Sequence, residues 1–363
     1  MTVYRKIRRK YICERDKIFD LLKKYDYHLD RGEWPIDRFL KKNFAQYIDD
    51  LKQAVRSEDN PVLGAKVCAL IEQNILSIRK NADSLIKVLD LSIYKNDKDG
   101  ARCLAFQIFE AMRPHFLQHR CKSERYYRIR KLSDESITHL ERKEMFHVPY
   151  DKKENVSASR YSLAEVPCLY LATQPELAWC ECDQPFRFAI AQFDLPSPEE
   201  GCLHLIDFSP KMVMRSTGFA SCFRSSPEKE DPERKKSIQE LIQALCIYPL
   251  RAACSVTKAR QEDCVKTAKG GQDEKSTQEE YILPQLLMEW IRDGQEFDGI
   301  CYESSSSSCK EILRCLGGYN IALPTRECNM DEEGYDRQLR AKIKVGEPTI
   351  FNPDNFSIDF RHI

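Results

Sequence analysis

The spacing of apolar residues changes near residue 124, and this change limits the folds that the chain can adopt. Before it, several stretches show the three-to-four-residue spacing of one face of an α-helix. After it, short apolar runs of the kind that form strands follow one another, separated by polar and proline-containing breaks. We therefore expect an α+β protein, in which an N-terminal helical bundle precedes a domain built on a β-sheet.

The predicted bundle spans residues 1–120 and contains no cluster of residues typical of catalysis. Its apolar stripes lie within residues 18–25, 36–51, 67–78 and 104–112. Residues 1–120 hold 24 Lys and Arg against 17 Asp and Glu, a net charge of +7, although the whole chain is neutral. This excess is compatible with binding to nucleic acid or to an acidic partner, but an ordinary solvated helical surface is the favoured interpretation. The role of the bundle stays open.

The predicted second domain spans residues 121–325, and residues 326–363 form a C-terminal tail that we expect to pack on it. Strand candidates lie at residues 126–131, 145–149, 167–173, 187–194, 203–207, 297–302 and 319–323. Helix candidates lie between them at residues 175–182, 235–245 and 284–292. The strands are too short and irregular for a doubly wound parallel sheet.

Several classes of protein are disfavoured by what the sequence lacks. No apolar run is long enough to span a bilayer, and no secretory signal is recognisable, so we expect a cytoplasmic protein with no membrane partner. The 16 cysteines include no Cys-x-x-Cys pair, and we interpret them as reduced thiols. The seven histidines are dispersed, so no metal site is predicted. Phosphate-loop, dinucleotide-fold, zinc-protease and serine-hydrolase signatures are all missing from the sequence.

Residues 160–181 carry the most informative chemistry in the chain. Arg160 lies in a polar turn, Tyr170 in a short apolar strand, and Glu181 on a helix that follows it. An arginine can bind a pyrophosphate through two parallel hydrogen bonds, and an aromatic ring can stack on a planar base. A carboxylate stabilises positive charge that develops on a ribose. Together these residues predict a site that binds a dinucleotide and breaks a bond to its ribose.

Each candidate residue also has a simpler structural interpretation. Arg160 and Arg128, a second possible phosphate anchor, could be surface arginines at strand or turn ends. Tyr170 could pack in the core, and Glu176 is a helix acid of the ordinary first-turn kind, favoured there by the helix dipole. Ser304 opens a run of five serines that could be a flexible loop, and Ser305 competes with it for any role in binding.

The motifs between residues 124 and 325 resemble, in order, those of the RES domain family, which is named for its arginine, glutamate and serine. The matching segments are Tyr127-Arg128-Ile129-Arg130, Arg160-Tyr161-Ser162, Leu169-Tyr170-Leu171-Ala172, Glu181 and Asp298-Gly299-Ile300, followed by Tyr302 and Ser304. The resemblance implies an ADP-ribosyltransferase-like split β-sheet. Known members of the family are bacterial toxins that degrade NAD or transfer ADP-ribose.

By this resemblance the chain is expected to be an NAD-cleaving enzyme, either a glycohydrolase or a phosphorylase, that acts on the nicotinamide–ribose bond. Arg128 and Arg160 would hold the phosphates, Tyr170 the nicotinamide and Ser304 the ribose side, while Glu181 would stabilise the transition state. NAD would be the substrate, and no cofactor is implied. The alternatives are ADP-ribosyl transfer to a protein or nucleic acid, and an inactive RES scaffold with a binding bundle. Expected partners are NAD, an antitoxin covering the site and a second copy of the chain.

Overall fold

The computed structural model describes residues 16–25, 29–120, 125–195, 202–209, 232–258, 278–304 and 317–351. Its helices and its mixed sheet confirm the predicted α+β class. The chain divides into two compact units, which are described separately. The first unit comprises residues 1–117 and 210–286, and the second comprises residues 118–209 and 287–363.

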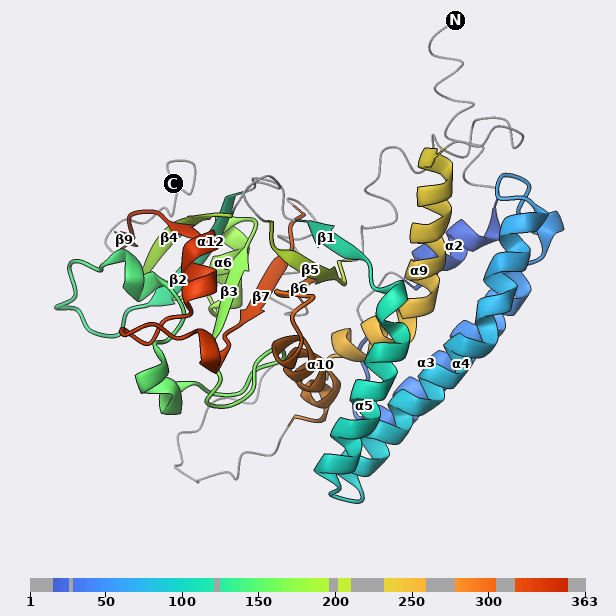
Figure 1. Ribbon diagram of the computed structural model, residues 1–363, viewed down its shortest axis with the longest axis horizontal. Coiled ribbons are helices and arrows are strands. Elements are labelled where there is room, and N and C mark those ends of the chain that lie inside the picture. Colours follow the sequence, from blue (N-terminus) through green and yellow to red (C-terminus); the bar gives the residue numbers. More distant parts are fainter. Residues whose placement is uncertain are drawn as a thin grey trace, which may run out of the picture. The chain divides into compact units, whose positions relative to one another are not determined.

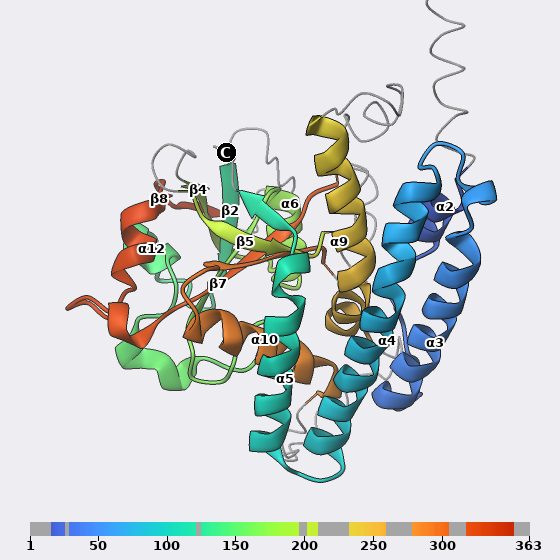
Figure 2. The same ribbon diagram turned by 45° about the vertical axis from the view of Figure 1, so that its right-hand side comes forward.

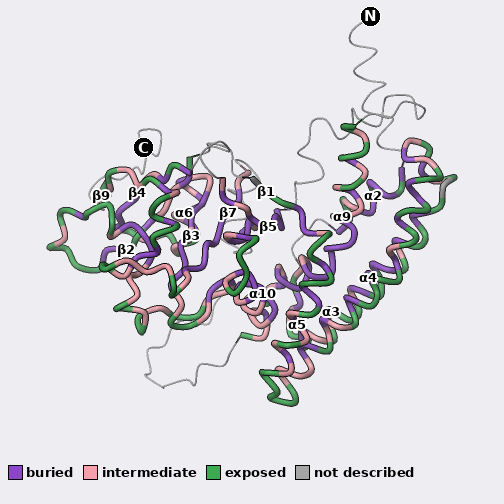
Figure 3. Tube along the Cα trace, in the orientation of Figure 1, coloured by how far each residue is buried: buried purple, intermediate pink, exposed green. Residues whose placement is uncertain are grey.

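The first unit is a group of helices arranged around one long central helix. The central helix α4 (Ala65–Ile93) packs against α3 (Ile36–Ala54), α5 (Lys98–Met112) and α9 (Pro232–Ser255) (Figure 1, Figure 2). The short helix α2 (Lys17–Lys24) packs on α3. Buried and exposed residues alternate along α3 and α4 (Figure 3), as expected for amphipathic helices. No described helix of the chain combines the length and the apolar composition needed to cross a membrane.

The position of α9 differs from the predicted domain boundaries. The sequence analysis included this helix in a continuous domain over residues 121–325, whereas the structure groups it with the N-terminal helices. The Tyr47 hydroxyl donates to the Leu245 carbonyl at 2.7 Å, and the Tyr248 hydroxyl donates to Asn43 Oδ1 at 2.8 Å. The sheet domain is therefore interrupted by a helix that buries its apolar face in the bundle, a long-range pairing that local periodicity does not reveal.

The second unit contains one sheet with the strand order β1-β5-β6-β7-β3-β2-β4-β8, and β9 also pairs with β4. The pairing is antiparallel except between β5 and β6, which are parallel. In chain order the strands are β1 (Gln118–Arg120), β2 (Arg125–Lys131), β3 (Cys168–Ala172), β4 (Phe188–Asp194), β5 (His204–Asp207), β6 (Gly299–Tyr302), β7 (Asn320–Pro324), β8 (Lys344–Val345) and β9 (Thr349–Phe351). Helix α10 (Ile282–Asp293) crosses the boundary between the two units.

The two faces of the sheet are covered by different elements. Leu169 and Leu171 of β3 belong to a core cluster that includes Leu339 of the short helix α12 (Arg337–Lys342). Ala172 belongs to a second cluster with Leu177 and other residues of helix α6 (Pro175–Glu181). Because successive side chains of a strand point to opposite faces, Tyr170 lies on the same face as Ala172, which is the face that α6 covers.

Two parts of the second unit differ from the sequence-based expectations. Residues 145–149 were predicted to be a strand, but the segment continues from a 3-10 helix (Arg142–Met145) in which Glu141 and Glu144 form a reciprocal capping box. A buried apolar run of this length does not distinguish a strand from other buried segments. Residues 326–351 contain α12, β8 and β9, none of which was predicted. They add two strands and a short helix, of which Leu339 is buried, to the sheet unit.

Candidate active site

Glu181 is the last residue of α6, and its position is set by the way this helix ends. The Gln184 amide donates to the Trp179 carbonyl at 3.0 Å, and the Asp183 amide donates to the Cys180 carbonyl at 3.0 Å. These two bonds form a Schellman motif, in which the residue after the cap adopts a left-handed conformation. Asp183 takes that position with φ +58°, although glycine is the residue that usually occupies it. Glu181 therefore lies on a fixed turn of the helix.

Neutral donors and one cation surround the Glu181 carboxylate. Asn320 donates from Nδ2 to Glu181 Oε1 at 2.7 Å, and the Ser304 hydroxyl also hydrogen-bonds to Glu181. Burial raises the pKa of the Glu181 carboxyl, while the two hydrogen bonds and the charge of Arg160 oppose this shift. Glu181 is nevertheless exposed to solvent by its accessible area. Glu181 is thus accessible to solvent, while the protein atoms packed around it raise the free energy of its ionised form.

The sheet brings Ser304 and Asn320 to Glu181 from two neighbouring strands. Asn320, the first residue of β7, pairs with Tyr302 of β6 on one side and with Ala172 of β3 on the other. Ser304 follows β6 by two residues. Both residues are buried: Asn320 is 3% exposed and Ser304 is 1% exposed. Buried polar groups need partners, and Glu181 supplies one to each of them.

The start of β7 is held close to the start of α6. The Thr173 amide donates to the Tyr319 carbonyl at 3.0 Å, and the Tyr319 amide donates to Thr173 Oγ1 at 3.0 Å. Gly318 has φ +112°, and a Cβ atom at this position would lie 3.0 Å from Thr173 Oγ1. A side chain here would be strained both by its backbone conformation and by this close approach. The glycine thus permits the contact that places Asn320 beside Glu181.

Arg160 occupies a tight turn between Ser159 and Ser162. The Ser159 amide donates to the Ser162 carbonyl at 3.0 Å, and the Ser162 amide donates to the Ser159 carbonyl at 3.3 Å. Arg160 and Tyr161 are the two corner residues of this turn. The positive charge of Arg160 opposes the rise in the Glu181 pKa, so two of the three residues proposed from residues 160–181 interact in the structure.

Tyr170 is joined to the same turn through its hydroxyl group. Tyr170 Oη and Ser159 Oγ share a hydrogen bond of 2.7 Å, and Ser159 Oγ and Ser162 Oγ share one of 2.8 Å. Burial raises the Tyr170 pKa well above its ordinary value, so the hydroxyl keeps its proton at neutral pH. Glu181 affects another tyrosine, Tyr302, whose pKa is raised by burial and by the negative charge of Glu181. The Tyr302 ring packs against the ring of Tyr161 at a centroid distance of 4.4 Å.

Arg128 lies where β2 and β3 separate. These two described strands share one register pair, Tyr127 with Ala172, while Arg128 continues to pair with Ala191 of β4. Within the described residues, Arg128 Nη1 is buried and has no hydrogen-bond partner. Burial lowers the pKa of the Arg128 guanidinium. Burial also raises the pKa values of the Cys168 and Cys182 thiols, and the positive charge of Arg128 opposes this rise. Arg128 is thus a partly exposed cation whose buried Nη1 atom has spare hydrogen-bonding capacity within the described residues.

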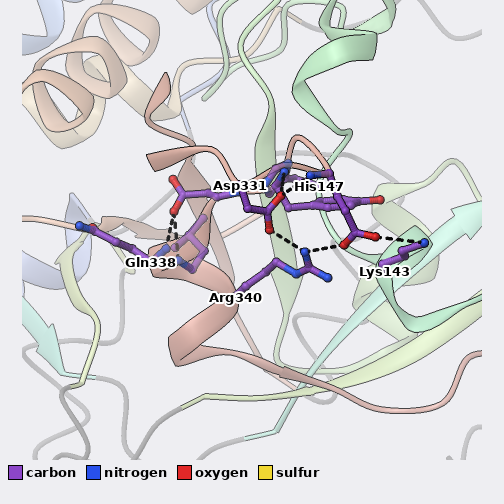
Figure 4. Close-up of polar contacts among 9 residues, drawn as sticks. Lys143, His147, Asp331, Gln338 and Arg340 are labelled. Atoms are coloured by element: carbon purple, nitrogen blue, oxygen red, sulfur yellow. Dashed lines mark hydrogen bonds and ion pairs between the residues drawn. The ribbon is translucent and has the colours of Figure 1, made fainter. Parts of the chain in front are cut away.

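His147 is a structural residue whose two ring nitrogens are both used. The Asp336 amide donates to His147 Nε2 at 3.0 Å (Figure 4). The Nε2 atom therefore carries no proton, and the protonated Nδ1 atom donates to the Val148 carbonyl at 2.7 Å. Burial lowers the His147 pKa to about 4, so the ring is neutral at physiological pH. His147 is thus a buried histidine whose hydrogen-bonding groups are both satisfied.

Sequence reasoning missed Asn320 and Ser159, and it named Ser162 only as part of a motif without giving it a role. The available signal for Asn320 was a polar residue at the start of an otherwise apolar segment, Ile321-Ala322-Leu323. The two serines flank the Arg160-Tyr161 pair, where small polar residues are common in turns. Ser305, which was considered beside Ser304, lies outside the described residues. Within the described part of the chain, no group of three or more His, Cys, Asp or Glu side chains could hold a metal ion.

Comparisons with known proteins give one extended match. No protein-family model matches the chain, and no solved structure matches it. A Bacillus subtilis (strain 168) protein named "Putative toxin YopC" is 22% identical over 339 residues. The alignment covers 90% of this chain and 69% of that protein, so it includes the bundle as well as the sheet. Over nearly its whole length, then, the chain is similar to a protein described as a toxin.

Proposed function

We propose that the unit formed by residues 118–209 and 287–363 binds NAD and cleaves the bond between nicotinamide and ribose. The observation that carries this proposal is the Glu181 carboxylate, which is open to solvent, held by Asn320 and Ser304, and subject to the charge of Arg160. The order of the Arg128, Arg160, Tyr170, Glu181 and Ser304 motifs along the chain resembles that of the RES domain, which supports the same assignment.

In this reaction the C1′–N bond of NAD breaks and its electron pair leaves with nicotinamide. Positive charge then develops on the ribose ring, and Glu181 stabilises it electrostatically. Water or inorganic phosphate forms the new bond at C1′. A carboxyl whose pKa is raised by burial accepts a proton from an attacking water more readily than an ordinary glutamate does. Because the leaving group is already a pyridinium, the reaction needs no additional cofactor.

The two arginines fit the phosphate groups of the substrate in different ways. Arg160 is carried on a turn beside Glu181, where it can hold an anion near the reacting carbon. Arg128 has a buried Nη1 atom without a hydrogen-bond partner in the described structure, and a phosphate oxygen would satisfy it. Leaving such a group unpaired destabilises a fold, and this kind of cost is often retained at functional sites.

The similarity to a protein described as a toxin supports a further part of the proposal. Loss of NAD would stop the growth of the cell that makes the enzyme, so its activity must be held in check. We propose that a protein antitoxin binds over the Glu181 site. In a bacterial host, induced expression of the wild-type chain should therefore arrest growth, and Glu181→Gln should relieve the arrest.

The direct test follows NAD loss over time with purified protein, with and without inorganic phosphate, and separates the products by chromatography. Wild type should consume NAD, and Glu181→Gln should lower the rate by about 10²–10⁴-fold. Glu176→Gln is the matched control, because Glu176 lies in the first turn of the same helix. Free ADP-ribose would indicate hydrolysis, a phosphorylated product phosphorolysis, and a labelled macromolecule ADP-ribosyl transfer. NAD that remains intact with candidate acceptors present would contradict the enzyme proposal.

A further inference from the structure

The turn that carries Arg160 is closed at its base by three hydroxyl groups. Ser159 and Ser162 are joined by two backbone hydrogen bonds and by a 2.8 Å contact between their side-chain oxygens. The Tyr170 hydroxyl joins them from the neighbouring strand, 2.7 Å from Ser159 Oγ. The burial of Ser162, which is 5% exposed, keeps water from replacing these bonds.

Tyr170 is a rigid point of attachment for this turn. It is the middle residue of β3, where it pairs with Ala322 of β7, and its neighbours Leu169 and Leu171 are fully or almost fully buried. A group on such a strand is held more firmly than one on a loop. The turn, by contrast, is a two-residue connection whose corner residues Arg160 and Tyr161 have no left-handed backbone angles. The turns that usually connect strands so tightly do have such angles, so this one relies on side-chain contacts.

Tyr161 provides the second attachment of the turn. Its ring is 3% exposed and packs on Tyr302 with 4.4 Å between centroids and an angle of 45° between planes. Tyr302 lies on β6, two residues before Ser304. The turn is therefore fixed on one side to β3 and on the other to β6, the strand that leads to the Ser304 hydroxyl bound to Glu181.

We propose that Tyr170 is a positioning residue, whose hydroxyl, acting through Ser159 and Ser162, holds the Arg160 guanidinium at the distance from Glu181 that substrate binding requires. This inference rests on the proposed NAD cleavage. It assigns the importance of Tyr170 to the hydroxyl and not to stacking of its ring on nicotinamide. Tyr302, whose pKa is affected by the charge of Glu181 and whose ring packs on Tyr161, is then a candidate aromatic contact for nicotinamide.

The substitution Tyr170→Phe separates the two roles, because it keeps the ring and removes the hydroxyl. We expect kcat/KM for NAD to fall by about 10- to 100-fold, mainly through KM, because a small displacement of a binding group is enough for such a loss. Tyr126→Phe is the matched control. It removes another buried tyrosine hydroxyl, which contacts Tyr319 Oη at 2.9 Å in the core cluster on the other face of the sheet.

Ser159→Ala tests whether the effect passes through the turn. If Tyr170 acts through Ser159, the double variant Ser159→Ala with Tyr170→Phe should be no worse than the more severe single variant. Additive losses would overturn the proposal, since they would mean that the two hydroxyls act separately. Activity of Tyr170→Phe equal to that of Tyr126→Phe would overturn it as well, and would return Tyr170 to the stacking role.

Hydrogen exchange at the Ser159 and Ser162 amides gives a measurement that does not need turnover. Both amides donate across the turn, so Tyr170→Phe should speed their exchange, and Tyr126→Phe should leave it unchanged. Unchanged exchange in Tyr170→Phe would overturn the proposal even if activity fell. If wild type consumed no NAD, the proposed function would fail, and the exchange data would still decide whether Tyr170 holds the turn.

Discussion

Asn320 donates a hydrogen bond of 2.7 Å from Nδ2 to Oε1 of Glu181, across 139 positions of sequence. The asparagine is the first residue of a central strand and the glutamate the last residue of a helix, so the pair connects the sheet to the element that covers it. A neutral donor at this place stabilises the ionised carboxylate without cancelling its charge. Glu181 thereby stays available to stabilise positive charge on a substrate.

We predict that Asn320→Asp lowers activity more than Asn320→Ala does. The aspartate would put a second carboxylate against Glu181, and two adjacent carboxylates hold a proton between them at higher pH than either does alone. The acidic limb of the pH–kcat/KM profile should move upward by about one unit or more, with about fivefold or more lower activity at the former midpoint. Asn320→Ala should move the limb less in the same direction.

The control for this prediction is Gln192→Glu. Gln192 lies on β4, and its Nε2 atom donates to Asp194 at 2.9 Å in a solvent-exposed contact, so this change also places one acid beside another. Its profile should match that of wild type. A profile of Asn320→Asp that is scaled down but not displaced along the pH axis would mean that Asn320 does not set the ionisation of Glu181.

The raised pKa of Glu181 has a consequence for stability that can be measured without substrate. A carboxyl with a higher pKa in the folded than in the unfolded protein binds more protons when folded, between the two values. Its contribution to stability is complete below its unfolded pKa and is lost as the pH rises through the folded pKa. Glu181→Gln should therefore gain stability relative to wild type as the pH rises from about 4 toward neutrality.

Urea unfolding at a series of pH values checks this expectation, with Glu176→Gln as the reference. The difference in unfolding free energy between wild type and Glu181→Gln should change over that range, by less than the roughly 1.4 kcal/mol per pH unit of a full proton, because solvent screens the exposed Glu181 carboxylate. A difference that does not depend on pH would show that Glu181 titrates in the folded protein as it does in the unfolded chain.

Arg128→Met is predicted to raise stability and to abolish NAD binding. Burial of the guanidinium costs free energy, and within the described residues its Nη1 atom recovers none of this through a hydrogen bond. Because an unpaired charge is costly to bury, an apolar side chain of similar length at this position should make the folded protein more stable. In thermal unfolding the variant should melt above wild type, and NAD should raise the melting temperature of wild type alone.

The contrary outcomes of this experiment are also informative. A variant less stable than wild type would mean that Arg128 is held by favourable contacts and serves the fold. A variant that NAD still stabilises would remove Arg128 from the binding site. In that case Arg160 would remain as the candidate phosphate anchor.

Local patterns in the sequence were enough to predict the elements that depend on periodicity. Leu40, Phe44 and Leu51 are spaced for one helical face, and all three are buried on α3, which begins directly after Pro35. Glu181 was predicted to lie on a helix over residues 175–182, and α6 does begin at Pro175. Helix formation and first-turn preferences depend on neighbours within a few residues, so one segment carries the information.

Features that depend on strand register could not be predicted in this way. Asn320 reaches Glu181 because β7 pairs with β3 and β6 in one particular alignment, and nothing near Asn320 in the sequence encodes that alignment. The same holds for α9, whose packing on α4 joins segments far apart in the chain. Residues 145–149 were misassigned for a different reason. Met145, Phe146 and His147 are all buried, but they lie in an irregular segment that follows a 3-10 helix.

The neutral His147 ring predicts a loss of stability in mild acid. Its Nε2 atom accepts the Asp336 amide, and Asp336 in turn caps α12 by accepting from the amides of Gln338 and Leu339 (Figure 4). Protonation of Nε2 would place its N–H group against the N–H group of Asp336, and the hydrogen bond between them would be lost. The charge of Arg128 also disfavours the imidazolium, while Asp331 and Asp336 favour it too weakly to offset burial.

Because the folded pKa of about 4 lies below the ordinary value of 6.5, the unfolded chain binds the extra proton first as the pH falls. The contribution of His147 to stability is therefore complete above about pH 6.5 and decreases down to about pH 4, by up to about 1.4 kcal/mol per pH unit.

His147→Gln, which does not titrate, should be about 1–3 kcal/mol less stable than wild type at pH 7. This deficit should shrink as the pH falls, and titration of the imidazole followed by NMR provides the direct check. A folded-state midpoint near 6.5 would contradict the assignment, because a ring that accepts the Asp336 amide cannot take up a proton without breaking that bond.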